Sequence, residues 1–425
     1  MPSRPRPPLR WDLVTESFSE ATFLWARWQD ALESPRHTLT SVLHWVEERL
    51  QGALDGVRLG EQRATDEILL PALLGKRDRP AAVAAHLLVG GARQGIEQVA
   101  AALLGAAPRR LAALAQAIAC STGAQWPKVL VEYVPRMPAQ VQAAVLDAFA
   151  FRRWPLPPGI DAQIERNAKP VQLASLRLAA CVGDRWTVPY IEWGLRRSDP
   201  ELRVAAARAA LLRGLEGAVA KAADAVRDDI PGSDALLPLL VAMRGERLLP
   251  VLPVRLQRPG VDARAVFDAL WCMGTVGAAD LCAARLDDPT HARLAADALR
   301  GITGIDPTPP PGREAPLDVP RDELMLPEPD PAALRERWLE RRPRMLEHQR
   351  HLEGEPFDPG DVLPRLARTP LRRRHRLADE LAARSGGAQQ LETRAWSRVQ
   401  WAQLAALSHA AQPGYPNRAA GAGGA

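Results

Sequence analysis

The stretch SDPELRVAAARAALLRG, residues 198–214, carries the signals that decide the fold. Asp199 can accept hydrogen bonds from the first backbone N–H groups of a helix, and Pro200 suits the first helical position because it has no N–H to lose. Apolar residues then recur every three or four positions and predict one amphipathic helix that Gly214 ends: Leu202, Ala205, Ala206, Ala209 and Leu212. Because this stripe is mostly alanine, it buries little area per residue, so the helix needs neighbours on more than one side.

The same proline-led, alanine-rich pattern recurs along the chain. The prolines that mark it are 28 to 32 residues apart: Pro80, Pro108, Pro138, Pro170, Pro200, Pro231, Pro259 and Pro289. Each interval has room for a second helix, as in GLEGAVAKAADAVRDD. A period near 30 residues with two antiparallel helices in each unit is typical of helix-pair solenoids, whose repeats stack into one continuous core.

The clearest copy, DPELRVAAARAALLRGLEGAVAKAADAVRDD (199–229), resembles the short form of the HEAT repeat. The resemblance covers residues 80–305 and implies an all-α chain: a HEAT-like α-α superhelical solenoid, here with helical caps at both ends. A narrower resemblance rests on EATFLWARWQDAL (20–32), GITGID (301–306) and RHLEGEPFDPGDVL (350–363). These motifs look like an uncharacterised proteobacterial HEAT-repeat family that is often found beside type VI secretion genes and has no established activity.

These patterns divide the chain into regions. We expect an N-terminal helical cap (1–79), a HEAT-like solenoid of about eight repeats (80–305), a Pro-rich linker (306–331), a C-terminal helical region (332–410) and a disordered tail (411–425). The N-terminal cap carries Trp25, Trp28 and Trp45, which form a bulkier apolar face than the alanine-rich repeats. Such a face suits a cap that covers the open end of a solenoid.

Composition excludes some classes of protein and weakens the case for others. No apolar run reaches the roughly 18 residues that a membrane-spanning helix needs, and MPSRPRPPLRW has no apolar segment behind its charges, so we expect a cytoplasmic protein without membrane contact. The net charge is +5, but it is spread along the chain: residues 1–79 hold 11 basic and 12 acidic residues. A nucleic-acid-binding protein normally concentrates its cations on one face, so nucleic acid is not the favoured partner.

Catalytic and metal-binding signatures are absent from the sequence. It holds no nucleophile elbow, Walker A loop, zinc-binding helix or strand-linked dinucleotide motif, and we predict no enzyme, no cofactor and no metal. The glycines of VGGARQG (89–95) lie between two predicted helices, where a turn explains them better than a phosphate site. His348 and His351 lie three apart on a predicted helix, and a solvated polar face is favoured over a metal site. The four cysteines have no metal-site spacing and are expected to be buried thiols: Cys120, Cys181, Cys272 and Cys282.

Aromatic residues on the second helices are the candidate partner-binding residues. Trp126 and Tyr133 lie seven residues apart and therefore share a helix face, and Trp186 and Trp193 repeat this arrangement 60 residues later. If these rings point between repeats, they are core residues that fill space left by alanine. If they point outward, they form a ladder suited to gripping a partner.

A second candidate surface is the basic cluster RRRHR in the C-terminal region. Arg372, Arg373, Arg374 and Arg376 are dense enough for a basic patch that binds a polyanion. Asp379 and Glu380 follow directly, so a solvated face with internal ion pairs is the favoured interpretation.

Three functions are compatible with these observations. The first is a non-enzymatic scaffold or adaptor that binds a protein partner, which the resemblance implies is a type VI secretion component such as an effector or spike being loaded. The second is a HEAT-like nucleic-acid-binding protein or DNA glycosylase, in which Trp126, Trp186, Trp193 and Asp184 would supply the site. A tetrapyrrole lyase is the third, because related short repeats occur in such enzymes, although no motif indicates a chromophore pocket.

Overall fold

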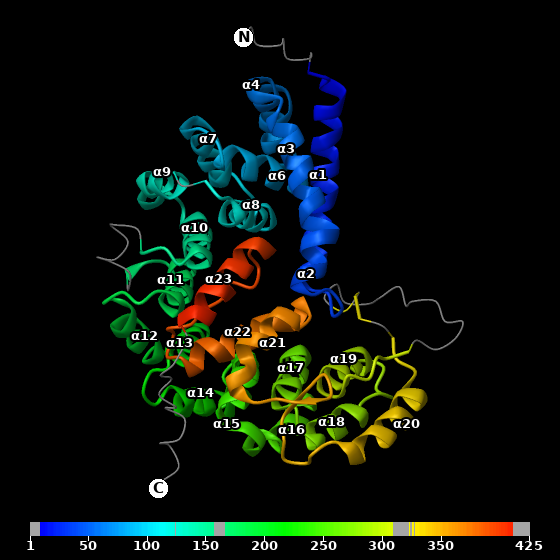
Figure 1. Cartoon of the computed structure of the whole chain (residues 1–425). Coiled ribbons are helices and arrows are strands. Elements are labelled where there is room, and N and C mark those ends of the chain that lie inside the picture. The colour runs from blue at the N-terminus through cyan, green and yellow to red at the C-terminus, as the bar shows by residue number, and fades with distance from the viewer. Residues whose placement is uncertain are drawn as a thin grey trace. The chain divides into compact units, whose positions relative to one another are not determined.

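The computed structural model is mostly helical in the residues it describes, so the chain is all-α as predicted (Figure 1). It describes residues 9–123, 125–156, 166–308, 323, 325–326 and 328–410. The strands in this part form one antiparallel hairpin, in which β1 (His351–Leu352) pairs with β2 (Glu355–Pro356). None of the helices described has the length and apolar character needed to cross a membrane.

The chain divides into two compact units, each built from three separate segments. Unit 1 comprises Met1–Leu32, Leu39–Tyr190 and Arg394–Val399, and unit 2 comprises Glu33–Thr38, Ile191–Thr393 and Gln400–Ala425. The region boundaries that we expect from the sequence remain predictions. Most of the predicted linker (309–322, 324 and 327) and the predicted tail (411–425) lie outside the described residues.

Unit 1 contains the N-terminal helices and the first predicted repeats. Its elements, where η marks a 3-10 or π helix, are α1 (Trp11–Leu32), α2 (Leu39–Val42), η1 (Leu43–Glu47), α3 (Glu48–Arg58), α4 (Glu61–Ala64), η2 (Thr65–Leu69), α5 (Leu70–Leu74), α6 (Asp78–Val89), α7 (Arg93–Leu104), α8 (Pro108–Cys120), α9 (Trp126–Tyr133), η3 (Val134–Arg136), α10 (Ala139–Arg152) and α11 (Lys169–Cys181). The boundary between the units falls within α12 (Thr187–Leu195), and α23 (Ser397–Ala410) also has residues in both.

The proline-led helices of unit 1 pack in sequence order. Helix α6 contacts α8, α8 contacts α10, and α10 contacts α11, while α7 packs against α9 as a second helix. Each proline marker of unit 1 lies in the first turn of its helix or directly before it, where a missing N–H leaves no helical hydrogen bond unmade. The local sequence signals therefore place these helices where the repeat pattern predicts them.

Two helical segments lie beside the proline-led helices: α1, and η1 continued by α3. Helix α1 runs antiparallel to η1 and α3, as Figure 1 shows. Trp28, near the end of α1, donates a hydrogen bond to Glu47, whereas Val14, near its start, lies close to Gly60 after α3. Trp25 and Trp28 are buried in this packing, as expected for a bulky apolar face, whereas Trp45, expected on the same face, is 73% exposed.

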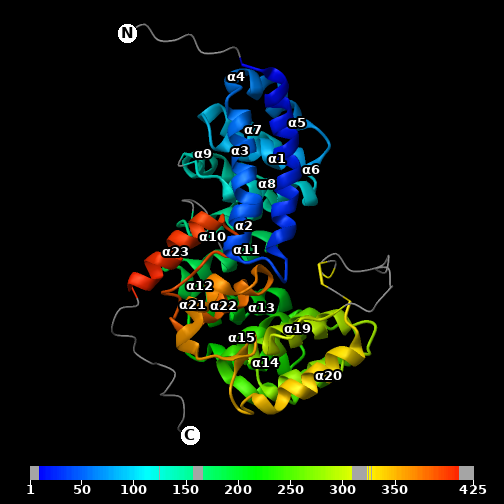
Figure 2. The same cartoon turned by 45° about the vertical axis from the view of Figure 1, so that its right-hand side comes forward.

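Unit 2 contains the later predicted repeats and the C-terminal helices. Its elements are α13 (Pro200–Leu212), α14 (Ala218–Arg227), η5 (Ser233–Leu236), α15 (Leu237–Arg244), η6 (Gly245–Leu248), α16 (Val251–Leu256), α17 (Ala263–Met273), α18 (Val276–Ala283), α19 (Ala292–Thr303), α20 (Pro331–Arg341), η7 (Arg342–Arg344), η8 (Pro359–Asp361), α21 (Val362–Arg368) and α22 (Leu371–Arg384), with the hairpin between η7 and η8. Helix α15 contacts α17, and α17 contacts α19, which repeats the order of unit 1 (Figure 1). Helix α14 packs beside α15 (Figure 2).

Helix α13 folds from its local signals and is buried on more than one side. The Asp199 side chain accepts hydrogen bonds from the backbone N–H groups of Glu201 and Leu202, at 3.0 and 3.1 Å. Gly214 follows the helix with φ of +59°. Helix α22 packs against it, and Arg208 forms an ion pair with Asp379 of that helix at 2.8 Å. An alanine-rich helix gains its stability from such neighbours rather than from one wide apolar face.

Candidate functional site

Trp126, the first of the candidate aromatic residues, is a core residue. Its side chain is fully buried at the start of α9, with ring centroids 5.9 Å from Phe149 and 4.6 Å from Trp154. A ring enclosed in this way cannot reach a partner or a nucleic-acid base. The prediction of Trp126 as a binding residue is therefore wrong, because neighbouring aromatic side chains on and after α10 enclose it.

The other three candidate aromatic residues are half-buried. Tyr133 ends α9, and Trp186 directly precedes α12. The Trp186 indole donates a hydrogen bond to Asp184 at 3.3 Å, and its ring lies 5.9 Å from Tyr190. Trp193 lies under the guanidinium group of Arg197 at 5.1 Å. Trp186 and Trp193 have local partners, and all three rings keep some exposed surface, so their role in binding stays a prediction.

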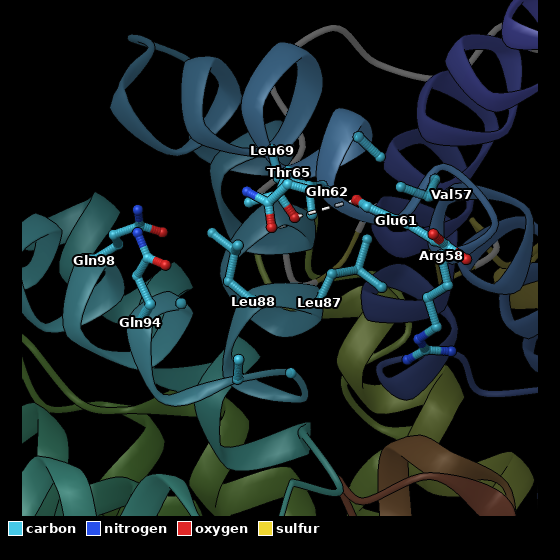
Figure 3. Close-up of a pocket in the computed structure, with 14 residues that line it drawn as sticks. Val57, Arg58, Glu61, Gln62, Thr65, Leu69, Leu87, Leu88, Gln94 and Gln98 are labelled. Carbon is cyan, nitrogen blue, oxygen red and sulfur yellow. Dashed lines mark hydrogen bonds between the residues drawn. The ribbon is translucent and has the colours of Figure 1, made fainter.

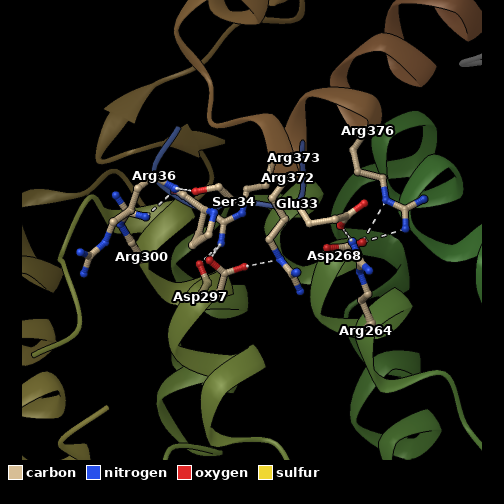
Figure 4. A network of polar contacts seen from close by, with 11 residues as sticks. Glu33, Ser34, Arg36, Arg264, Asp268, Asp297, Arg300, Arg372, Arg373 and Arg376 are labelled. Carbon is tan, nitrogen blue, oxygen red and sulfur yellow. Dashed lines mark hydrogen bonds and ion pairs between the residues drawn. The ribbon is translucent and has the colours of Figure 1, made fainter. Parts of the chain in front are cut away.

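The basic cluster of α22 is not a surface patch. Arg372, Arg373 and Arg374 are buried, and the first two form ion pairs with Asp297 of α19 (Figure 4). Arg376 forms a 2.7 Å ion pair with Asp268 of α17. These four guanidinium groups are therefore not available to a polyanion, so the possible basic patch and the favoured solvated face are both wrong. The acidic partners come from distant helices rather than from the adjacent residues that the sequence suggested.

The histidines of EHQRHLE do not share a helix face. His348 lies in a turn, 85% exposed, with Glu246 at 3.6 Å, whereas His351 is buried in β1. The predicted helix here is wrong, because β1 and β2 form a hairpin. Across the described ranges, no group of three or more His, Cys, Asp and Glu side chains is arranged to hold a metal ion.

A buried polar centre in unit 1 joins α1, η1, α8 and the segment Arg394–Val399. Glu47 accepts hydrogen bonds from the Trp28 indole at 2.9 Å and from both the backbone N–H and the hydroxyl of Ser397. Burial raises the pKa of this carboxyl group above its ordinary range. Trp396 stacks on Trp28 at 4.5 Å and donates to the Cys120 carbonyl. Every group here has a partner within the unit, so the centre stabilises the fold.

Two exposed aromatic side chains lie on contacting helices of unit 1, α1 and η1; the sequence analysis named Trp45 only as part of an apolar cap face and did not name Phe23. Phe23 of α1 is 62% exposed, and Trp45 of η1 is 73% exposed. Glu20 and Arg49 form an ion pair between the same helices at 3.1 Å. Phe23 lies about one helical turn after Glu20, and Trp45 lies about one turn before Arg49. Because α1 runs antiparallel to η1 and α3, both aromatic residues lie on the same side of the ion pair along the helix axis. We name Phe23 and Trp45 the aromatic surface.

A pocket lies elsewhere in unit 1, where α3, α4, η2, α6 and α7 meet (Figure 3). Its volume is about 250 Å³. Apolar side chains and polar side chains both line it: Val57, Leu69, Leu87 and Leu88, with Arg58, Glu61, Gln62, Thr65, Gln94 and Gln98. Figure 3 shows Gln94 and Gln98 together on one wall, with Leu88 between them and Gln62.

The local sequence explains how this pocket forms. The VGGARQG stretch joins α6 to α7 as a turn, and Gly95 lets the two helices approach closely, since a Cβ atom there would lie 2.7 Å from the Leu88 carbonyl oxygen. Glu61, at the opposite edge, has a positive φ of 46°, which is uncommon for a residue with a side chain. Such backbone strain clusters at ligand-binding sites and switches.

The comparisons with known proteins find no matching family model, no similar curated protein and no similar solved structure. The geometry of the described residues is therefore the basis for assigning a function.

Proposed function

We propose that this chain is a non-enzymatic, cytoplasmic scaffold that binds a protein partner on a HEAT-like α-solenoid. The packing of proline-led helices in sequence order supports this proposal in each unit, from α6 to α11 in unit 1 and from α15 to α19 in unit 2. Stacked helix pairs of this kind offer extended surfaces for partners. The resemblance described above adds a type VI secretion component as the partner.

The observation that carries the proposal is the aromatic surface. Soluble proteins bury most large aromatic side chains, and Trp and Tyr are enriched at the energetic centres of protein interfaces. Trp45 is exposed even though Trp25 and Trp28 of the neighbouring helix are fully buried. The Glu20–Arg49 ion pair beside it supplies the polar rim that surrounds such centres in protein interfaces.

The nucleic-acid alternative has less support. Its cationic cluster on α22 is buried in ion pairs, and Trp126 is enclosed in the core. Phosphate binding depends on exposed Lys and Arg side chains that can replace counterions.

The test is affinity purification of the tagged protein from its own host at near-endogenous expression, followed by mass spectrometry. The variant carries Phe23→Ala and Trp45→Ala, and the matched control is Leu104→Ala, which shortens another exposed apolar side chain of unit 1. Because these side chains are exposed, we expect each variant to keep its fold to within about 0.5 kcal/mol, checked by circular dichroism and denaturation.

We expect a protein partner that co-purifies with the wild type and the control and falls more than about tenfold with the double variant. Equal recovery with both variants would remove the aromatic surface from the proposal. Recovery of nucleic acid alone, or of no partner, would overturn the scaffold function itself.

A further inference from the structure

We propose that the pocket in unit 1 binds an extended peptide segment that carries one aliphatic side chain. The proposal deepens the scaffold function above and rests on it, because it specifies the chemistry of a partner segment. The aliphatic side chain would lie on Leu87 and Leu88, and the flanking peptide units would face the glutamine side chains of the wall.

The pocket contains a buried hydrogen-bond acceptor without a partner, which favours a ligand that carries amide groups. The side-chain oxygen of Gln98 is buried and has no hydrogen-bond partner. A buried polar atom without a partner carries a desolvation cost that a ligand can remove. A glutamine amide offers both a donor and an acceptor, and a peptide unit offers one of each, so the two groups are complementary in either orientation.

The neighbouring side chains extend this amide-binding wall. Gln94 lies one helical turn before Gln98 on α7 and therefore on the same face. On the opposite side, the Gln62 amide donates to Asp66 at 3.0 Å, which leaves its carbonyl oxygen as an acceptor for the ligand. These groups alternate with apolar side chains, as expected for a site that reads a peptide backbone and one side chain together.

The charges at the pocket favour an uncharged ligand. Its lining includes one cation, Arg58, and one anion, Glu61. The Arg58 guanidinium already forms an ion pair with Asp55 at 2.5 Å. A phosphate or nucleotide would place its negative charge near Glu61, and the one lining cation, Arg58, is already paired with Asp55. The VGGARQG glycines therefore serve the turn and the close helix approach, in agreement with the expectation from the sequence.

The size of the pocket limits the ligand to a short segment. Pockets that enclose drug-sized molecules measure roughly 300–1,000 Å³. The volume here is about 250 Å³, which fits one aliphatic side chain with its two flanking peptide units. N-acetyl-leucine N-methylamide reproduces this unit and is the probe for the test. A ligand of this size that binds with ordinary efficiency has a dissociation constant of about 1 mM.

The experiment titrates this probe into the full-length protein with methyl-labelled leucine and follows the signals of Leu69, Leu87 and Leu88 by NMR. We expect saturable shifts with the probe and at least about fivefold weaker binding by 3-methylbutan-1-ol, which has the aliphatic group without peptide units. Inorganic phosphate should leave these signals unchanged. Absence of saturable shifts at about ten times the expected dissociation constant, or equal binding of the alcohol, would overturn the proposal.

The matched variants are Gln98→Leu in the pocket and Gln51→Leu on α3 outside its lining. Gln98→Leu should fold normally, because it removes a buried oxygen that has no hydrogen bond. We expect this variant to weaken probe binding at least about fivefold and the Gln51 variant to bind as the wild type does. Equal binding by Gln98→Leu would also overturn the proposal.

The outcomes separate this inference from the scaffold function. If the probe does not bind but a partner still co-purifies with the wild type, the pocket proposal fails and the scaffold stands. If the probe binds and no partner is recovered from the host, the scaffold proposal fails while the peptide site remains.

Discussion

His86 shows how burial fixes the charge of one residue. Its ring is buried on α6, 5.2 Å from Trp25 and 5.8 Å from Trp396, and its Nδ1 lies 3.2 Å from the Ala117 carbonyl oxygen. Burial lowers its pKa from 6.5 to about 4. The folded protein therefore holds a neutral imidazole under conditions in which the unfolded chain takes up a proton.

We predict a corresponding acid sensitivity. A depressed pKa contributes stability that is fully present above pH 6.5 and is lost as the pH falls to about 4. The shift corresponds to about 3 kcal/mol of unfolding free energy. His86→Phe keeps a ring in place but cannot take up a proton. Between these pH values, the variant should lose about 3 kcal/mol less unfolding free energy than the wild type loses. Denaturant unfolding at several pH values measures this difference.

The control for this prediction is His348→Phe, which replaces an exposed histidine. This substitution leaves the buried His86 ring in place, so the loss of stability between these pH values should persist. The raised pKa of Glu47 has the opposite effect on the unfolding free energy as the pH falls. Glu47 is present in every variant, so its effect cancels in the comparison. A His86→Phe variant as acid-sensitive as the wild type would contradict the prediction.

At the scale of elements, two glycines inside helices have opposite roles. Gly52 lies within α3, and a Cβ atom there would meet nothing within 4 Å. Gly301 lies within α19, and a Cβ atom there would overlap the Arg373 guanidinium and lie 2.5 Å from the Trp271 ring. The first glycine only weakens its helix, whereas the second makes room for a buried ion pair.

We therefore predict opposite effects of the same substitution. Gly52→Ala should raise the unfolding free energy by about 0.5–1 kcal/mol, because alanine restricts the unfolded chain and favours helix. Gly301→Ala should lower it by at least about 2 kcal/mol, because the Arg373 side chain must move away from Asp297. Chemical denaturation of both variants gives the two values. A stabilising Gly301→Ala would show that the α19–α22 contact tolerates a methyl group.

Local signals predict most of the elements, and tertiary neighbours decide the rest. The proline-led helices could be read from the sequence, because caps and apolar stripes lie within a few residues of each other. The helix expected at His348 and His351 is wrong because Glu353 and Gly354 both take positive φ and turn the chain into a hairpin. The His351 backbone N–H also donates to Gly274, and this long-range contact has no signature in the local sequence.

The candidate sites were harder to predict, for the same reason. Trp126 and Trp45 both lie on amphipathic helices, and only the aromatic side chains around Trp126 make it a core residue. Arg372 and Arg373 look like a patch until Asp297, more than 70 residues earlier, is placed beside them. The pocket is assembled from several elements, and the sequence pattern indicated only its VGGARQG turn.

At the scale of the whole molecule, the ion pairs of α22 hold unit 2 together. Asp297→Ala leaves Arg372 and Arg373 buried without their carboxylate, which costs roughly 3–5 kcal/mol. We predict faster hydrogen exchange in α17, α19 and α22, measured by mass spectrometry on the intact chain. The control, Asp147→Ala, removes an exposed ion pair with Arg177 in unit 1 and should cost at most about 1 kcal/mol. Unchanged exchange in those helices would contradict the prediction.

The division of the chain into interleaved segments has a consequence for anyone who would dissect the protein. A single cut after Tyr190 would deprive unit 1 of Arg394–Val399, and with it Trp396 and both Ser397 donors to the Glu47 carboxylate. It would also leave Glu33–Thr38, which contribute to unit 2, on the wrong fragment. Each unit is thus built from segments that are not consecutive in the chain. Either unit is therefore better studied by reconstitution from complementary fragments than by truncation.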